Sequence, residues 1–189
     1  RGINSFFSPY EVYCIYKDRK GAMWFGTSVF GACRFDGKSI KWMYENNLTI
    51  GLNGGTFGIR SIFEDKKGEF WFCNTWHKYI FDFEKTTESD RLQYQKTEGI
   101  GNEKIFDGDK YVYYSHIVED NKGNIWLTTW DKGVYKYDGK HITNYLVKDD
   151  SNDVNLISMY KDKQGNLWLG TPDNGIFKFN GNTFEKFKP

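Results

Sequence analysis

The sequence lacks the features that mark several large classes of protein. No run of apolar residues in its 189 residues approaches the length of a membrane-spanning helix. Its 26 basic and 25 acidic residues are mixed along the chain, which gives a net charge of +1. A nucleic-acid-binding surface needs a patch of one sign instead. We therefore expect no membrane span within this chain and no nucleic-acid partner.

Cysteine and histidine are scarce as well, with three copies of each. An odd number of cysteines excludes a fully paired disulfide framework, so we interpret Cys14, Cys33 and Cys73 as small core residues. The histidines are spread over different segments, with no spacing that suits a metal site. The sequence thus predicts no metal, no cofactor and no catalytic constellation. Because the chain begins with arginine rather than methionine, we expect a processed or excised product.

Internal repetition is what the chain has in abundance, together with 19 % aromatic residues. Four times, an aspartate is followed by glycine at the third place and tryptophan at the sixth, with threonine three or four residues later. The aspartates are Asp18, Asp65, Asp120 and Asp162, and the glycines are Gly21, Gly68, Gly123 and Gly165. The tryptophans are Trp24, Trp71, Trp126 and Trp168, and the threonines are Thr27, Thr75, Thr129 and Thr171.

Each repeat alternates like sheet rather than helix. In the fourth repeat we expect strands over 156–160, 166–171, 176–179 and 183–187, with tight turns between them. The aspartate of the motif suits the first turn because its carboxylate hydrogen-bonds to its own backbone two residues on, and the glycine supplies a positive φ. Both motif residues therefore have a structural reason.

Four short strands per repeat predict an all-β fold, a β-propeller built from four blades of four antiparallel strands. The expected blades cover about 10–45, 57–97, 112–147 and 154–189 of a single domain, residues 1–189. In each blade the motif tryptophan is interpreted as a wedge between neighbouring blades. Burying one indole removes ~150–250 Å² from water, which is worth roughly 4–6 kcal/mol before entropy is counted.

The repeat resembles that of the two-component regulator propeller family. The likeness lies in Asp-x-x-Gly-x-x-Trp, the following Gly-Thr, and a later Gly-(Ile/Val)-(Phe/Tyr)-Lys-(Phe/Tyr)-(Asn/Asp)-Gly. It departs in the second repeat, where Cys73-Asn74 and Tyr79 replace glycine. The resemblance implies a bacterial sensor propeller of the periplasm or cell surface, often attached to a histidine kinase. The full sensors of that family are larger, with more blades, a membrane span and a kinase.

Three ways of closing the ring stay open at this point. The four blades close as a small ring, form half of an eight-bladed ring made by two chains, or are a piece of a larger ring. Residues 3–7 resemble the closing strands of the repeats and predict a spare outer strand. Such a strand would cover a bare sheet edge in a homo-oligomer.

Connection order predicts a face that gathers the second-to-third connections and the linkers between blades. Two linkers, 45–57 and 97–113, are unusually long. We expect the glycines of 51–58 to form a surface loop rather than a phosphate cradle, and the acidic run 148–153 to be a solvated linker rather than a calcium site.

The candidate ligand-binding residues lie on this face. Trp76 and Trp130 are expected to occupy the same loop position in neighbouring blades, as stacking platforms for a saccharide ring or as plugs of the central channel. Hydrogen-bonding groups would come from the same connections. The set is Phe30, Trp76, His77, Trp130, Asp131, Lys132, Asp173 and Asn174.

Three functions fit these observations. The leading one is a non-catalytic ligand-binding or sensor-like propeller that recognises a saccharide fragment. A protein-interaction scaffold that assembles through the spare edge strand is the alternative. A lyase or hydrolase on a propeller scaffold is the third. Among the histidines, however, only His77 is expected on the face that gathers the second-to-third connections and the linkers.

Overall fold

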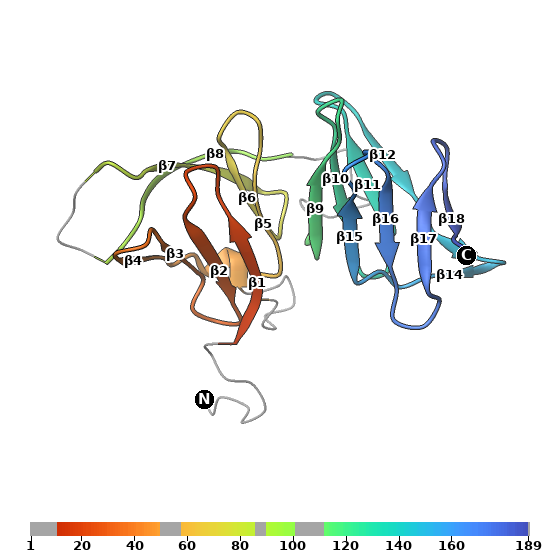
Figure 1. The fold of residues 1–189 in the computed structure, drawn as a ribbon, viewed down its shortest axis with the longest axis horizontal. Helices are drawn as coiled ribbons and strands as arrows, with labels where there is room; N and C mark the ends of the chain where they lie inside the picture. Colours follow the sequence, from red (N-terminus) through yellow and green to blue (C-terminus); the bar gives the residue numbers. More distant parts are fainter. Residues whose placement is uncertain (1–10, 50–57, 86–89, 101–111, 189) are drawn as a thin grey trace. The chain divides into compact units, whose positions relative to one another are not determined.

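The computed structural model describes residues 11–49, 58–85, 90–100 and 112–188, and these residues form an all-β protein (Figure 1). Four antiparallel sheets contain four strands each, and the strands of every sheet follow one another in chain order. Each sheet is a propeller-type blade, so the predicted fold class is confirmed. The chain divides into two compact units, Arg1–Tyr113 and Tyr114–Pro189, with two blades in each. The predicted spare strand at 3–7 and most of the glycine loop at 51–58 lie outside the described residues.

The first unit holds blades 1 and 2. Blade 1 consists of β1 (Val12–Lys17), β2 (Met23–Thr27), β3 (Ala32–Phe35) and β4 (Ile40–Met43), and a single helical turn, α1 (Asn46–Thr49), follows it. Blade 2 consists of β5 (Ile62–Glu64), β6 (Phe70–Phe72), β7 (His77–Asp82) and β8 (Gln93–Glu98).

The second unit holds blades 3 and 4. Blade 3 consists of β9 (His116–Glu119), β10 (Ile125–Thr128), β11 (Val134–Tyr137) and β12 (Ile142–Tyr145). Blade 4 consists of β15 (Ser158–Lys161), β16 (Leu167–Gly170), β17 (Ile176–Phe179) and β18 (Phe184–Lys186).

The acidic run between blades 3 and 4 is largely exposed, as expected of a solvated linker, and it forms a small hairpin of β13 (Lys148–Asp149) and β14 (Asn152–Asp153). Asp150 turns it with φ +56°. One oxygen of Asp149 accepts hydrogen bonds from Lys186 and Asn174, which ties the hairpin to blade 4. These bonds order a segment whose composition alone indicated solvation.

The motif aspartate does more in the structure than turn the chain. Its Oδ1 accepts the backbone N–H four residues on, at 2.8–3.1 Å, in all four blades. Its Oδ2 accepts the indole N–H of the motif tryptophan, at 2.9–3.0 Å. The motif glycine closes the turn with φ between +84° and +89°. The repeat is therefore a hydrogen-bonded unit that fixes each indole to its own turn, a link that the spacing did not predict.

The wedge role of the tryptophan is confirmed within each unit. In the first, Trp24 is fully buried, and its ring lies 5.0 Å from those of Phe70 and Phe81 in blade 2. In the second, Trp126 is 2 % exposed and meets Phe179 of blade 4 at 4.9 Å. An indole of one blade thus fills the apolar face of the next.

The other two motif tryptophans differ from this pattern. Trp71 is 3 % exposed and lies on the face of blade 2 opposite the one that receives Trp24, so its wedge role stays a prediction. Trp168 is only half-buried, against Phe187 of its own blade at 5.2 Å. Blade 4 is the last blade of its unit, so the wedge role of Trp168 also stays a prediction.

The outer edge of blade 1 is joined to blade 2 by main-chain hydrogen bonds. Trp42 of β4 donates to the carbonyl of Asp90 at 2.6 Å and accepts from the N–H of Leu92 at 2.8 Å. The segment that precedes β8 thereby lies alongside β4 (Figure 1). Blade 1 has no bare edge at this point.

All three cysteines are free thiols, as predicted. Cys33 and Cys73 are buried, and the Sγ atoms of Cys73 and Cys14 donate to the carbonyls of Leu48 and Ile59, at 3.2 and 3.3 Å. Burial raises the pKa of each thiol, that of Cys14 to about 12. The thiols therefore remain protonated and act as core residues.

Candidate functional site

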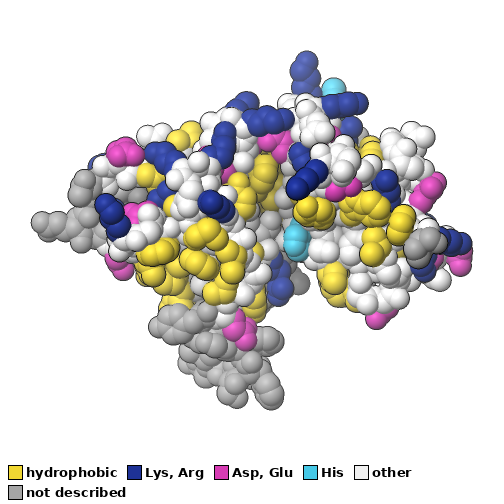
Figure 2. All heavy atoms as spheres, viewed as in Figure 1, with side chains coloured by type: hydrophobic (Ala, Val, Ile, Leu, Met, Phe, Trp, Pro, Cys, Tyr) yellow, Lys and Arg dark blue, Asp and Glu magenta, His cyan; other side chains and the backbone are white. Residues whose placement is uncertain are grey.

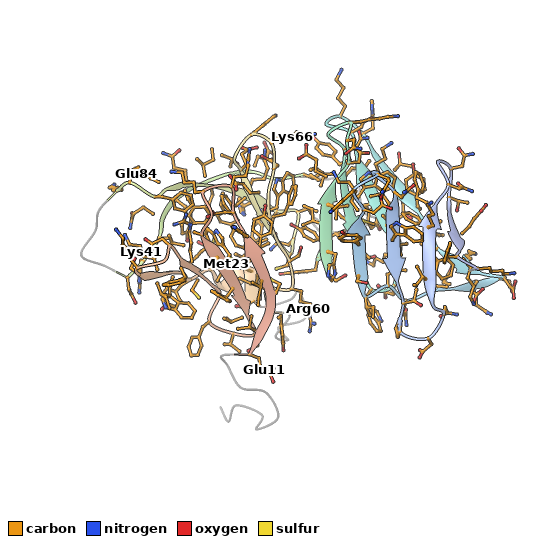
Figure 3. The ribbon with its side chains drawn as sticks, viewed as in Figure 1. Glu11, Met23, Lys41, Arg60, Lys66 and Glu84 are labelled. Atoms are coloured by element: carbon orange, nitrogen blue, oxygen red, sulfur yellow. The ribbon has the colours of Figure 1, made fainter. Side chains whose placement is uncertain are left out.

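In each unit, one end of the blades gathers the linkers and the second-to-third connections, as the connection order predicted. The N–H of Ile59 donates to the carbonyl of Thr27 at 2.9 Å, and the N–H of Leu156 to that of Trp130 at 2.8 Å. In the first unit Glu11 and Arg60 lie at this end, while Lys66 of the β5–β6 turn lies at the other (Figure 3). We call this end the loop rim.

Blade 2 departs from the other three in its second-to-third connection. Trp71 pairs with Lys78, seven residues on, whereas the equivalent pairs in the other blades are ten residues apart. The chain makes this tighter reversal through Cys73, whose φ is +25°. The connection is therefore three residues shorter than its counterparts.

This shortening changes three sequence-based assignments. His77 and Lys78 lie in β7 rather than in a loop. Tyr79 is not the counterpart of the later glycine but pairs with Phe70, and its ring is buried. Lys78 and Lys136 are equivalent, because each pairs with the motif tryptophan of its blade. Trp76 precedes Lys78 by two residues and Trp130 precedes Lys136 by six, so the two tryptophans are not equivalent in register.

Trp76 forms a fixed aromatic surface on the loop rim of the first unit. Its side chain is 39 % exposed, and its ring stacks on that of His77 at 4.9 Å with 29° between the planes. The backbone N–H of Trp76 donates to Oδ1 of Asn74 at 3.0 Å, and its backbone carbonyl accepts from the N–H of Gly99 at 3.0 Å. A Cβ on Gly99 would lie 2.0 Å from the carbonyl oxygen of Thr75, so the approach needs glycine. We call the Trp76 and His77 pair the Trp76 surface.

Charged and hydroxyl groups accompany this surface. Glu45 accepts hydrogen bonds from the Tyr94 hydroxyl at 2.7 Å and from the Lys96 ammonium at 2.9 Å. Burial lowers the pKa of His77, Lys96 lowers it further, and Glu45 opposes the shift. The imidazole is therefore neutral at pH 7, able to donate and accept one hydrogen bond each. Glu45, Tyr94 and Lys96 were missed from the sequence, because they stand outside the repeat motif.

Trp130 lies on the loop rim of the second unit, 54 % exposed. Before it, the hydroxyl of Thr129 donates to the carbonyl of Gly133 at 2.8 Å and accepts from the N–H of Lys132 at 3.0 Å. Asp131 and Lys132 are exposed at the tip of the same connection. The bonds of Thr129 fix the turn, so the indole is presented from an ordered loop.

The remaining candidates are less available to a ligand. Asn174 is half-buried, and its Nδ2 donates to Asp149 at 3.1 Å, while Asp173 is exposed beside it. Phe30 is half-buried in the β2–β3 connection of blade 1. Trp76 and His77 are in direct contact. The joint use of Trp76 and Trp130, whether as platforms or as a channel plug, stays a prediction.

A family model supports the repeat assignment. The model described as two component regulator propeller matches residues 7–29, 108–131 and 148–173. The chain carries repeats of this family. Each matched segment contains one Asp-Gly-Trp motif, and the copy that begins at Asp65 falls outside them, in keeping with the shortened connection of its blade. A comparison with curated proteins gave no match.

Solved structures share the fold. The extracellular domain of a protein named as a hybrid two component system from B. thetaiotaomicron is 21 % identical with a TM-score of 0.64, over 98 % of this chain and 26 % of that one. Virginiamycin B lyase from Staphylococcus aureus is 17 % identical with a TM-score of 0.64, over 94 % of this chain and 55 % of that one. PorZ, a surface component of the type-IX secretion system of Porphyromonas gingivalis, is 16 % identical with a TM-score of 0.57, over 89 % and 26 %.

These identities support the fold alone. This chain spans about a quarter of the length of the first of these structures. Within the described ranges, no helix combines the length and hydropathy that crossing a membrane requires.

Proposed function

We propose that this two-component-regulator propeller domain is a non-catalytic recognition domain that binds a saccharide fragment on its loop rim. The observation that carries the proposal is the Trp76 surface, an exposed indole stacked on a neutral imidazole. The C–H face of a pyranose ring packs well on such a surface, because aromatic faces carry partial negative charge. The carboxylate of Glu45 and the ammonium of Lys96 lie close enough to His77 to influence its pKa, and they suit sugar hydroxyls.

We place this function outside the cytoplasm, in the periplasm or at the cell surface. The support is the family of the repeats and the fold shared with an extracellular domain of a two component system. A shared fold does not imply a shared activity, so the likeness to a lyase does not support catalysis and we propose recognition without turnover.

Isothermal titration calorimetry with a panel of plant and host oligosaccharides tests the proposal. We expect a hit with a micromolar to millimolar Kd, weakened at least ~10-fold by Trp76→Ala. A separate titration of Trp130→Ala measures whether the second indole contributes to the binding affinity. Tyr160→Ala is the matched control, because it removes an exposed ring from the first strand of blade 4, away from the loop rim.

Three results would contradict the proposal. Binding of none of the oligosaccharides removes saccharide recognition. Binding that Trp76→Ala leaves unchanged removes the Trp76 surface as its site. Cleavage of the bound oligosaccharide, followed by chromatography of the titrated samples, replaces recognition by catalysis.

A further inference from the structure

Arg34 differs from the residues that pair with the other motif tryptophans. It pairs with Trp24 across β2 and β3, whereas every other blade holds a lysine at this position. Its side chain is only 9 % exposed, and its Nε donates to Asp18 at 2.7 Å. In the part of the chain that the structure describes, its Nη1 and Nη2 have no acceptor. A buried guanidinium therefore keeps the donors of its terminal edge unused.

Arg34 lines a small hollow between the two blades of the first unit. The hollow has a volume of about 40 Å³, room for about three water molecules. Its walls come from β3 and β4 of blade 1, and from the end of β7 and the start of β8 in blade 2. The Phe83 ring packs on the guanidinium, 4.0 Å from its carbon, and Leu92 adds a buried apolar wall. The hollow has the size of one polar group, so the rest of a larger ligand would lie outside it.

A second cation stands at this hollow. Lys41, labelled in Figure 3, pairs with Arg34 directly across β3 and β4, so both side chains leave the same face of the sheet. Within the described ranges, the Lys41 ammonium has no acidic partner. Like charges directly opposite one another destabilise a sheet. A group of opposite charge bound between them would remove this repulsion.

The carboxylates that line the hollow are engaged in their own turns. Oδ1 of Asp36 accepts two backbone N–H groups of the β3–β4 hairpin, at 2.8 and 2.9 Å. Oδ1 of Asp82 accepts two backbone N–H groups of the turn that follows β7, at 3.1 and 3.2 Å. The donors of Arg34 and Lys41 are therefore left for a ligand.

The charge around the hollow suits a single negative charge. Four basic and two acidic residues line it, and Asp18 is bound to Arg34 from behind, so one positive charge is in excess. Over the face of the first unit that Figure 2 shows, basic and acidic side chains are intermingled. A polyanion would need a broad patch of one sign instead. A single carboxylate needs only local donors, and the planar fork of a guanidinium matches its two oxygens.

We propose that this hollow binds the carboxylate of a small organic acid or of an acidic sugar. The two carboxylate oxygens accept from Nη1 and Nη2 of Arg34, and the Lys41 ammonium donates to one of them. The second-to-third connections and the linkers contribute no wall of the hollow, so the site is distinct from the Trp76 surface and does not depend on the proposed function. Arginine in blade 1 then has a reason, because lysine offers no fork.

NMR titration of the ¹⁵N-labelled full chain with acetate, at pH 7 and constant ionic strength, tests the proposal. We expect the Nε–H signal of Arg34 and the indole N–H signal of Trp24, which share one Asp18 oxygen, to shift with a Kd on the order of 1 mM. Sulfate should bind more weakly, because it carries two charges. Glucuronate distinguishes the two sources: tighter binding than acetate identifies an acidic sugar, and equal binding a small acid.

Two variants and a control locate the site. Arg34→Lys should weaken acetate binding at least ~10-fold, because lysine keeps the charge beside Asp18 but has no fork. It copies the residue of the other blades, so the fold should persist. Lys41→Gln should weaken binding about three- to tenfold. Lys38→Gln is the matched control, because it removes the same charge from the exposed β3–β4 hairpin without touching the hollow, and it should leave the Kd unchanged.

Four results would overturn the proposal. The first is no shift of the two signals up to about 100 mM acetate. The second is sulfate binding tighter than acetate, which removes the carboxylate. The third is unchanged binding by an Arg34→Lys variant that circular dichroism shows to be folded. The fourth is an equal effect of Lys38→Gln and Lys41→Gln, which reduces binding to general attraction of anions, and this comparison decides alone if Arg34→Lys unfolds the chain.

Discussion

Asp18 and Arg34 form an ion pair of 2.7 Å, with side chains 1 % and 9 % exposed, and the same Asp18 oxygen accepts the indole N–H of Trp24. The guanidinium also lies 4.0 Å from the ring centroid of Phe83 in blade 2. In the other three blades the same register position holds a lysine, whose ammonium lies over that blade's own tryptophan at 4.9–5.6 Å. Blade 1 thus links its turn, its indole and the next blade through one buried charge pair.

Asp18→Asn should destabilise the protein more than Asp120→Asn. Removing the Asp18 charge leaves the buried guanidinium without its partner, which costs about 3–5 kcal/mol. Asp120→Asn loses one hydrogen bond at the indole or backbone, about 1–2 kcal/mol. Urea unfolding followed by circular dichroism measures both variants.

The double variant Asp18→Asn/Arg34→Met separates the charge from the packing. It should recover part of the loss, because no unpaired charge remains. Equal losses for Asp18→Asn and Asp120→Asn, or a double variant less stable than Asp18→Asn, would show that the ion pair has no special role.

Acid should unfold the protein through its motif turns. Burial raises the pKa of Asp18, but the hydrogen bonds from Arg34, Trp24 and Ala22 outweigh it and hold the pKa below its ordinary value. The Trp168 indole and Asn166 lower the pKa of Asp162 to about 2. A carboxyl with a depressed folded-state pKa stabilises the fold above its unfolded-state value, and this stability is lost as pH falls through the folded-state value.

We therefore expect the free energy of unfolding to fall slightly from about pH 7 to 5, because burial lowers the pKa of His77 and His116 and the unfolded chain binds their protons more readily. It should fall steeply between about pH 4 and 2, through the carboxyl groups of the turns. Thermal unfolding across this range, repeated with Asp162→Asn, measures the effect, and the variant should have a shallower acid slope. A wild-type midpoint that does not change down to pH 2 would contradict the role of the turns.

Gly31→Ala should cost far more than Gly175→Ala, although both glycines have the same left-handed backbone. Their φ values are +86° and +81°, so the conformational penalty, about 1–2 kcal/mol, is shared. A Cβ at Gly31 would lie 2.2 Å from the Met43 carbonyl oxygen, whereas at Gly175 it meets no atom within 4 Å. The difference between the two urea-unfolding free energies measures the clash alone, and equal values would refute it.

The three thiols should not react with alkylating reagents in the folded protein. Burial raises the pKa of all three, and a protonated thiol is a poor nucleophile. Iodoacetamide at pH 8 should label no cysteine over an hour, and all three after unfolding in urea, as read by mass spectrometry. Rapid labelling of the native chain at Cys33 or Cys73 would place these residues at the surface.

Much of the fold was predictable from the sequence because the turns repeat. The Asp-Gly spacing located four turns, and the alternation around Trp126 and Trp168 located their strands. The same reasoning failed for blade 2, because its second-to-third connection is three residues shorter than in the other blades. The spacing of Thr75 and Tyr79 from Trp71 therefore suggested wrong equivalents for them in the repeat. The spacing of motif residues does not determine the register in which neighbouring strands pair.

The candidate site was predictable only in part. Exposed tryptophans in connections are visible in a sequence, so Trp76 and Trp130 were found. Glu45 and Lys96 were not, because they meet across 51 residues and neither belongs to the motif.

The hydrogen bonds that Trp42 exchanges with Asp90 and Leu92 have a consequence for folding. The outer strand of blade 1, β4, cannot detach without breaking its hydrogen bonds to the residues just before β8. The two blades of the first unit should therefore unfold as one cooperative block. Amide hydrogen exchange would record this coupling directly. The N–H groups of Trp42 and Leu92 should become exchangeable at the same denaturant concentration, in step with those of β2 and β6.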